Sequence, residues 1–389
     1  MKPYLVISLI GSFQGILLSL LFLLKSKKRP ATLMLGLYVF TFSVGLLERG
    51  VANHSDFVGG KLLLSLIANS SLLYGPFLYL FVYYLTSGIS FFQKRQLIHV
   101  FLFFAFFGFD VFIILSGFTP VGEAASAMEL IGFEILVVQI LAYNILAIKL
   151  LDRHYQTILS TYSAIEERDL RWLKRLLLII TSIYAFSFLL SHLAFFGIKA
   201  ALNFFIIIQL AITFCIYLMS YMALLRPGMF ALLKNIRPIA EVINKNEDVF
   251  GPQLPKEDPV NFEKYKKSGL KSVQASQYLS SLKTLMESDK PYMNPELNVH
   301  ALSHLLGISK NHLTQVLNEH LEMNFFEFIN MYRIEEAKKL MLSPAYGQLS
   351  LQGIATESGY KSKATFFSNF RKITGLTPLE WLSSQKKSG

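Results

Sequence analysis

Apolar residues are gathered into seven long runs in the first 225 residues of the chain. The runs lie at residues 4–24, 31–47, 62–86, 97–117, 128–150, 173–196 and 201–225. A helix needs about 20 apolar residues to cross the roughly 30 Å of hydrocarbon in a bilayer. The pattern therefore predicts seven membrane-crossing helices in residues 1–225, of which 31–47 is the shortest. Pro76 predicts a kink in the third, because proline donates no backbone hydrogen bond.

The pattern changes after residue 225. Residues 226–275 are rich in Pro, Gly and charge, which is typical of an exposed linker. From residue 276 the apolar positions return at helical spacing with few β-branched runs. The expected fold class is all-α: a seven-helix transmembrane bundle (1–225), a linker (226–275) and a cytoplasmic helical domain (276–389).

An imperfect repeat runs through residues 276–389. Leu302 and Gly307 recur as Ile354 and Gly359, an offset of 52 positions. At an offset of 53, four residues recur as Ser362, Phe366, Phe370 and Trp381, the first copies being Ser309, Leu313, Leu317 and Phe328. Each copy predicts a helix, a glycine turn, a capping serine and a second helix, which is a helix-turn-helix unit. Residues 324–342 predict a long helix of about 28 Å that joins the two units.

The second helix of the first unit is expected at residues 310–319. Its packing face is predicted to hold Leu313, Val316, Leu317 and His320. The opposite stripe is polar and short-chained, as needed to reach base edges in a major groove. The predicted DNA-binding residues of this helix are Lys310, Asn311, Thr314, Gln315 and Asn318.

The second helix of the second unit is expected at residues 363–372. Phe366, Phe370 and Ile373 are predicted to pack inward. The repeat offset places Ala364, Phe367, Ser368 and Arg371 outward, with basic residues at the edges for phosphates. Phe367 fits either a thymine methyl contact or the core. The predicted DNA-binding residues here are Lys361, Lys363, Ala364, Thr365, Phe367, Ser368, Arg371 and Lys372.

Charge gives the chain an orientation. The formal net charge is +11, which suits an anionic partner such as lipid head groups or nucleic acid. With the N-terminus outside, the inner loops hold twelve basic residues and the outer segments four. The positive-inside bias then predicts the C-terminal domain in the cytoplasm. Residues 276–389 hold twelve Lys and Arg against ten Asp and Glu, a net +2, so the repeat and not the charge carries the DNA prediction.

Polar residues within the apolar runs are candidates for function. Asp110, Glu134 and His192 are predicted to line a sensing cavity, because ionisable groups at membrane depth are costly. Hydrogen bonding that holds the helices together is the ordinary alternative for each of them. The charged loop at residues 152–171 is expected to extend the fifth and sixth helices into the cytoplasm.

Catalytic and metal chemistry find little support. The one cysteine, Cys215, excludes an internal disulfide and a thiolate metal cluster. His300 and His304 lie one helical turn apart but lack an HExxH pattern, so packing or phosphate contact is expected instead of a metal site. Phosphate-binding glycine loops and an identifiable Ser/His/Asp set are absent from the sequence. The chain is predicted not to be an enzyme and to need no cofactor.

Two stretches resemble the AraC/XylS family of transcription regulators: LSHLLGISKNHLTQVLNEHLEMNFFEFINMYRIEEAKKLM and IATESGYKSKATFFSNFRKITGLTPLEW. The resemblance covers about residues 276–389. It implies DNA binding through two helix-turn-helix units, with recognition helices at 310–319 and 363–372. A seven-span module stands where the family usually has a soluble sugar-binding barrel, which looks like the membrane-anchored regulators of this family in Bacteroidetes-type bacteria.

The sequence thus predicts a membrane-bound one-component transcription regulator in the inner membrane of a bacterium. Its expected partners are double-stranded DNA, the lipid bilayer, RNA polymerase, a second copy of the chain, and a signal ligand or partner protein of unknown identity. The signal is expected to travel through the seventh apolar run and the linker, and release of the C-terminal domain by proteolysis within the Pro-rich linker is the competing route. The alternative is a transporter or intramembrane receptor with a helical protein-interaction domain.

Overall fold

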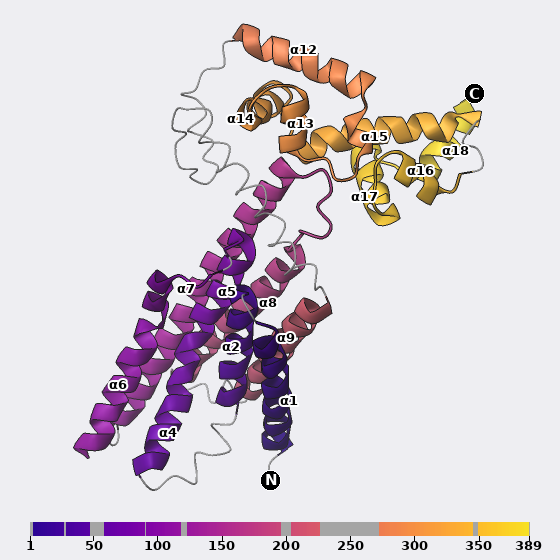
Figure 1. Ribbon diagram of the computed structural model, residues 1–389. Coiled ribbons are helices and arrows are strands. Elements are labelled where there is room, and N and C mark those ends of the chain that lie inside the picture. Colours follow the sequence, from indigo (N-terminus) through magenta and orange to yellow (C-terminus); the bar gives the residue numbers. More distant parts are fainter. Residues whose placement is uncertain are drawn as a thin grey trace. The chain divides into compact units, whose positions relative to one another are not determined.

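The computed structural model describes residues 3–26, 29–46, 58–89, 91–117, 123–195, 204–225, 272–344 and 349–388. Over these ranges the chain is helical, and an isolated bridge is its only β-type pairing, so the all-α fold class is confirmed (Figure 1). Contacts divide the chain into two compact units. The first comprises Met1–Arg153 and Leu170–Gly251, and the second His154–Asp169 and Pro252–Gly389. The predicted linker lies outside the described residues as far as residue 271.

Every apolar run forms helix in the first unit. The helices are α1 (Pro3–Lys25), α2 (Pro30–Gly45), α4 (Val58–Asn69), α5 (Tyr74–Ser87), α6 (Phe101–Ser116), α7 (Glu123–Thr161), α8 (Arg171–Phe195) and α9 (Phe204–Leu225). Short 3₁₀ segments precede α5 and α6, namely η2 (Ser70–Leu73) and η3 (Lys94–Val100). α7 continues well past the end of its apolar run, as the sequence predicts for the charged inner loop.

The third apolar run is broken where the sequence predicts a kink. α4 and α5 are separated by η2, and Pro76 follows in the first turn of α5. A proline ring clashes with the carbonyl four residues earlier, which here is Leu72 within η2. The hydroxyl of Ser70 donates to the carbonyl of Ile67 at 2.6 Å, which satisfies one acceptor beside the break.

Among the described residues, six helical segments are long and apolar enough to cross a membrane by length and composition. They are Ser8–Lys25, Gly59–Ser87, Lys94–Ser116, Leu130–Thr161, Arg171–His192 and Ile207–Leu225. α2, at 16 residues, is shorter and spans about 24 Å. Six of the seven predicted spans thus have the required length, and the count of seven stays a prediction.

Small residues let α1, α2 and α9 approach closely. The hydroxyl of Ser12 on α1 donates to the carbonyl of Ser43 on α2 at 2.6 Å, and the phenol of Tyr217 on α9 donates to the carbonyl of Gly11 at 2.6 Å. A Cβ at Gly15 would lie 2.0 Å from the hydroxyl of Ser43. Close contact through small residues, with hydrogen bonds across helices, is typical of packing in membranes, where lipid supplies little hydrophobic drive.

The second compact unit holds the predicted repeat of two helix-turn-helix units. Its helices are α12 (Ser272–Ser288), α13 (Val299–Leu305), α14 (Lys310–Gln315), α15 (Phe325–Leu342), α16 (Leu351–Glu357), α17 (Lys363–Thr374) and α18 (Pro378–Ser388). A 3₁₀ turn, η6 (Pro291–Met293), precedes α13, and a π-helical turn, η7 (Val316–His320), continues α14. Figure 1 shows α15 between the α13–α14 pair and the α16–α17 pair.

Two hydrophobic cores meet along α15. Phe325, Phe328 and Ile329 at its start belong to the core around α13 and α14. Ile334 and Ala337 further along belong to the core around α16 and α17. One rigid helix therefore carries both helix-turn-helix units, as the repeat predicts.

Candidate nucleic-acid interface

The two turns have the predicted backbone geometry. Gly307 has φ +66° and Gly359 has φ +88°, the left-handed region in which a side chain is strained. At Gly359 a Cβ would also lie 2.5 Å from the carbonyl oxygen of Tyr292, whereas nothing lies within 4 Å of one at Gly307. Gly359 is thus required both for its conformation and for the close approach of this turn to the backbone at Tyr292, just before the first helix-turn-helix unit.

Each recognition helix begins at the predicted serine cap. The side chain of Ser309 accepts a hydrogen bond from the backbone N–H of His312 at 3.1 Å. Ser362 accepts one from the N–H of Thr365 at 3.2 Å. A cap satisfies one of the unpaired N–H groups at a helix start and stabilises the helix by about 1 kcal/mol. A serine caps the recognition helix in both copies, which confirms that the sequence repeat corresponds to a repeated structure.

The predicted packing positions of the repeat are buried in pairs. Leu313 and Leu317 of the first unit correspond to Phe366 and Phe370 of the second, and all four are inaccessible or nearly so. Because these residues occupy the inner face, the opposite face of each helix is turned outward. α15 joins the two units over 18 residues, about 27 Å, with Asn324 and Glu327 forming a capping box at its start.

On the first recognition helix Asn311 is exposed, and Lys310, Thr314 and Asn318 are partly exposed. Gln315 departs from the predicted outward stripe, because its side chain is buried with 7% of its surface exposed. Its amide donates to the carboxylate of Glu319 at 2.9 Å. The outward placement of Gln315 is therefore wrong for the DNA-free protein.

A π-helical turn follows Gln315. η7 begins at Val316, and a π turn closes its hydrogen bonds over five residues instead of four. Residues beyond Gln315 therefore depart from the spacing of an ordinary helix. His320, predicted to pack, is exposed. Glu319, which holds the Gln315 amide, was not among the predicted residues.

The second recognition helix presents its predicted residues more faithfully. Lys363, Ala364, Ser368 and Arg371 are exposed along one face of α17, and Thr365 is partly exposed. Ile373, which was predicted to pack inward, is 40% exposed, so that prediction is wrong. The helix ends at Gly375, and Ile373 lies in its last turn beyond the reach of the core.

Phe367 packs against the core and is also partly exposed, so its contact with a thymine methyl stays a prediction. Its ring packs edge-on against Phe366 with centroids 5.8 Å apart, yet it stays partly exposed. The ammonium of Lys363 lies 5.3 Å from the centre of the Phe367 ring, a cation–π distance. The ring therefore anchors a lysine on the outer face while its inner edge contacts the core.

Two predicted phosphate ligands are held by carboxylates. Lys361 forms an ion pair with Glu296, which precedes α13. Lys372 pairs with Glu327 at 3.0 Å. Both carboxylates come from the first half of the domain, so these ion pairs connect the second helix-turn-helix unit to the first. Sequence reasoning missed both acidic partners, which are distant along the chain.

A polar cluster around α15 also joins the two helix-turn-helix units. The Arg333 Nε–H donates to the carbonyl of Tyr292 at 2.7 Å, and its guanidinium lies 5.6 Å from the ring centre of Tyr360. Glu336, one turn further, accepts from Lys290 at 2.8 Å and from the Tyr292 phenol at 3.2 Å. Burial raises the pKa of Glu336, but Lys290, Tyr292 and Lys339 together outweigh burial and leave that pKa below its usual value. The carboxylate thus stays ionised and holds η6 on α15.

The candidate sensing residues of the first compact unit lie in two polar clusters of three side chains each. Asp110 on α6 accepts hydrogen bonds from Ser65 at 2.8 Å and Asn69 at 2.7 Å, both on α4. Glu134 on α7 accepts from Ser191 of α8 at 3.1 Å, and His192 lies 3.7 Å from the same carboxylate oxygen. Each cluster joins neighbouring helices, which is the structural role that the sequence left open.

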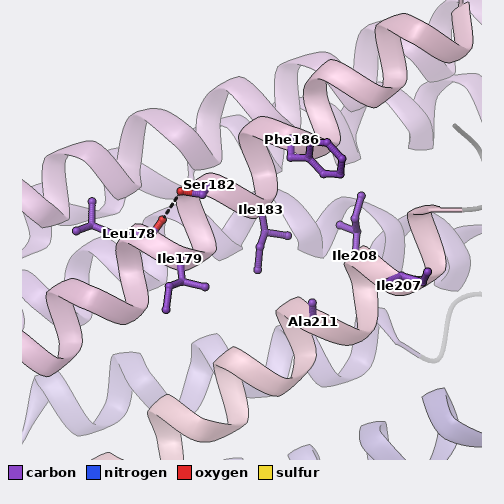
Figure 2. Close-up of a pocket in the computed structure, with 8 residues that line it drawn as sticks. All are labelled: Leu178, Ile179, Ser182, Ile183, Phe186, Ile207, Ile208 and Ala211. Atoms are coloured by element: carbon purple, nitrogen blue, oxygen red, sulfur yellow. Dashed lines mark hydrogen bonds between the residues drawn. The ribbon is translucent and has the colours of Figure 1, made fainter.

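An apolar groove lies between α8 and α9. Figure 2 shows its lining residues, Leu178, Ile179, Ser182, Ile183, Phe186, Ile207, Ile208 and Ala211. The polar member, Ser182, donates its hydroxyl to the carbonyl of Leu178 at 2.9 Å, so that hydroxyl is already used. The groove offers hydrocarbon contact without polar recognition, as expected of a lipid-facing surface. Over the described residues no three His, Cys, Asp or Glu side chains are grouped to hold a metal ion.

Comparison with known proteins agrees with the geometry of the second unit. Residues 302–384 match the family model described as a helix-turn-helix domain. The match includes both recognition helices and α15, which are the parts in which the sequence and the structure independently show the repeat.

Curated relatives share the same part of the chain. An uncharacterized HTH-type transcriptional regulator of Staphylococcus aureus strain COL is 32% identical over 90 residues, and one from strain MSSA476 is equally similar. The matched part is 23% of this chain and 12% of each relative, so the chain spans a small fraction of their length. No solved structure is significantly similar to the chain. The match supports the prediction that the chain is not an enzyme, since the helix-turn-helix regulator family is not enzymatic.

Proposed function

We propose that the chain is a membrane-bound transcription regulator of the AraC type, which binds specific DNA through the two helix-turn-helix units. The observation that carries the proposal is the pairing of α14 and α17, each capped, each presenting a polar face, and both fixed to α15. In the part of the chain that the structure describes, six helices of membrane-spanning length precede that domain. A DNA reader attached to such helices can act only on DNA near the bilayer.

The roles of the residues follow from exposure and chemistry. Asn311, in the first turn of α14, is the main candidate for reading a base edge, with Asn318 behind it. Thr314 is partly exposed, but its hydroxyl is buried, so it offers no hydroxyl to a base in this arrangement. Lys310, Lys363 and Arg371 supply charge for phosphates, and Ala364 and Phe367 supply apolar contact for thymine methyls. Thr365 and Ser368 can donate to phosphate or sugar. Lys361 and Lys372 contribute once DNA phosphates replace Glu296 and Glu327.

The membrane arrangement rests on loop charge. The N-terminus lies outside, the chain crosses the inner membrane of a bacterium seven times, and the C-terminal domain is cytoplasmic. Asp110, Glu134 and His192 are polar groups within the bundle through which a signal ligand or partner protein acts. A second copy of the chain places two reading domains on one site, and RNA polymerase is the partner that bound DNA brings near.

Sequencing of DNA bound to the full-length protein in its native cell tests the function. The wild-type chain is expected to enrich discrete two-part sites whose halves lie about one helical turn apart. Lys363→Ala with Arg371→Ala should abolish the enrichment, whereas Lys283→Ala on α12, which also removes an exposed lysine, should preserve it. Enrichment of no discrete site would favour the alternative, a protein-interaction domain on a receptor or transporter, which the near-neutral charge of residues 276–389 also permits.

A further inference from the structure

A segment of the predicted membrane module folds as part of the DNA-binding unit. His154–Asp169 comprises the end of α7 and the loop before α8, and its contacts assign it to the second unit. It is therefore joined covalently to two helices of membrane-spanning length while its side chains pack with the helix-turn-helix domain. We refer to His154–Asp169 as the strap.

Backbone pairing fixes the strap to the entrance of the first helix-turn-helix unit. The Ser163 N–H donates to the carbonyl of Leu297 at 3.2 Å, and the Ser163 hydroxyl donates to the same oxygen at 2.6 Å. Tyr162 forms an antiparallel bridge with Asn298. Asn298 is also the residue that caps α13. The strap thus fixes the start of α13, where the first helix-turn-helix unit begins.

The strap also completes the surroundings of a buried charge. Arg333 on α15 is 1% exposed. Its NH1 donates to the Ser163 carbonyl at 3.1 Å and its NH2 to the Ser163 hydroxyl at 3.0 Å, while its other partners are the carbonyls of Tyr292 and Asn294. Burial lowers the pKa of Arg333 to about 10. A buried guanidinium needs an acceptor for each N–H, and half of these bonds come from one strap residue.

Apolar contact and charge extend the strap across the domain. Ile158 and Ile165 are buried against Phe326, in the first turn of α15, with Tyr155, Leu159 and Tyr162 packed around them. Glu166 acts electrostatically on Arg333 and on Tyr360, the residue after the second glycine turn. The strap therefore contacts the first helix-turn-helix unit and α15. The charge of Glu166 also acts on the turn of the second helix-turn-helix unit.

We propose that the strap is the element through which the membrane helices control DNA reading. While the strap is docked on Leu297 and Arg333, the two helix-turn-helix units keep one fixed relation and bind a two-part site. Movement of α7 against α8 pulls on both ends of the strap and loosens that relation. This inference rests on the proposed DNA-binding function, and it gives the signal a route separate from the linker at residues 226–275.

The test uses the full-length chain in lipid nanodiscs and a DNA duplex selected from a random 40-base-pair pool by the wild-type protein. Ser163→Pro removes both donors to Leu297, because proline has neither the N–H nor the hydroxyl. Ser163→Ala removes the hydroxyl alone, and Ser160→Ala is the matched control, since Ser160 is on the same segment and donates only to Thr157 within α7. Affinity is measured for the selected two-part duplex and for each half-site duplex.

Ser163→Pro is expected to weaken two-part binding at least tenfold and half-site binding less than threefold, and Ser163→Ala to fall between it and the wild type. Retained half-site binding shows that the domain is folded. Ser160→Ala should match the wild type on both duplexes. Equal two-part affinity for Ser163→Pro and the wild type would overturn the inference.

Bilayer thickness supplies a mechanical input that needs no known signal, because a mismatched bilayer tilts its helices. Nanodiscs of C14 and C20 phosphatidylcholine should change wild-type two-part affinity at least threefold, and Ser163→Pro should remove this response. A response that persists in Ser163→Pro, or none in the wild type, would exclude the strap as the route.

A separate readout distinguishes failure of the inference from failure of the proposed function. Tyr162→Cys with Asn298→Cys, in a chain lacking Cys215, should form a disulfide on mild oxidation, because bridged antiparallel positions lie within disulfide reach. If the wild type selects no duplex, the DNA function fails, and the disulfide still reports whether the strap is docked. If the disulfide does not form while DNA binds, docking itself is refuted.

Discussion

The ammonium of Lys372 lies 3.0 Å from a carboxylate oxygen of Glu327, which joins the second recognition helix to the start of α15. The second oxygen of the same carboxylate accepts from the Asn324 N–H and completes the capping box. Glu327 therefore has two roles that can be separated by mutation. It caps α15, and it competes with DNA phosphate for Lys372.

Glu327→Gln is expected to strengthen DNA binding. Glutamine keeps the cap, since either side chain completes a capping box, but it no longer holds the lysine charge. Lys372 then no longer has to leave a carboxylate before it contacts phosphate, so affinity should rise roughly fivefold at low salt. Lys372→Ala should lower affinity and flatten the dependence of log affinity on log salt by about 0.9. Titration of the full-length chain between 50 and 200 mM salt measures both quantities, and an unchanged slope in Lys372→Ala would show that Lys372 does not contact phosphate.

Asn311 and Gln315 should differ in their effect on specificity. Asn311 is exposed in the first turn of α14, whereas Gln315 is buried and bonded to Glu319. Asn311→Ala is expected to relax the preference at one base pair of one half-site by about 1–3 kcal/mol. Gln315→Ala should change base preference less than half as much. Competition with duplexes altered at single positions gives both values, and a larger effect for Gln315 would mean that DNA draws its amide away from Glu319.

Local rules account for what the sequence predicted correctly. Gly307, Gly359, Ser309 and Ser362 are read from short patterns, because turns and caps involve residues only a few positions apart. The buried positions of the recognition helices follow from the same periodicity. Ile373 was misplaced for a local reason as well, the end of α17, whereas Gln315 is buried although the ordinary helical spacing of α14 predicts an outward position.

Contacts distant along the chain could not be predicted. Lys372 and Glu327 are 45 positions apart, and Ser163 and Arg333 are 170 positions apart. Hydrophobic periodicity shows which side of a helix packs, but it does not show what that side packs against. The strap was read as an extension of membrane helices because its sequence is amphipathic, and its apolar face is satisfied by Phe326.

Gly359 should tolerate a methyl group far less well than Gly307. Both have positive φ, which costs an alanine about 1–2 kcal/mol. At Gly359 the added Cβ would also lie 2.5 Å from the backbone oxygen of Tyr292, which cannot move away as a flexible side chain can. Gly307→Ala is therefore expected to cost about 1–2 kcal/mol and Gly359→Ala roughly 2–5 kcal/mol. Amide hydrogen exchange in the second compact unit of the full-length chain measures the free energy of opening. Equal losses of that free energy in Gly307→Ala and Gly359→Ala would show that contact with the Tyr292 oxygen adds nothing.

α2 decides whether the chain crosses the membrane six or seven times. Its 16 residues span about 24 Å, less than the roughly 30 Å of hydrocarbon. Eleven of its residues are nevertheless buried, and its contacts are with α1, α5 and other helices of the bundle. A helix surrounded by protein need not match the lipid thickness, because its ends can lie at the bottom of a thinned or water-filled vestibule. We therefore expect α2 to cross.

Reporter fusions test that expectation. An enzyme active only outside the cytoplasm should be inactive when fused after Arg29 and active when fused after Leu46, the residues on either side of α2. Fusions after Lys199 and Leu225 should be active and inactive respectively, which places the DNA-binding domain in the cytoplasm. If α2 does not cross, the activities after Arg29 and Leu46 will be alike, and the charge bias of the loops must be counted again for six spans. Activity after Leu225 would place the helix-turn-helix domain away from DNA and defeat the proposed function.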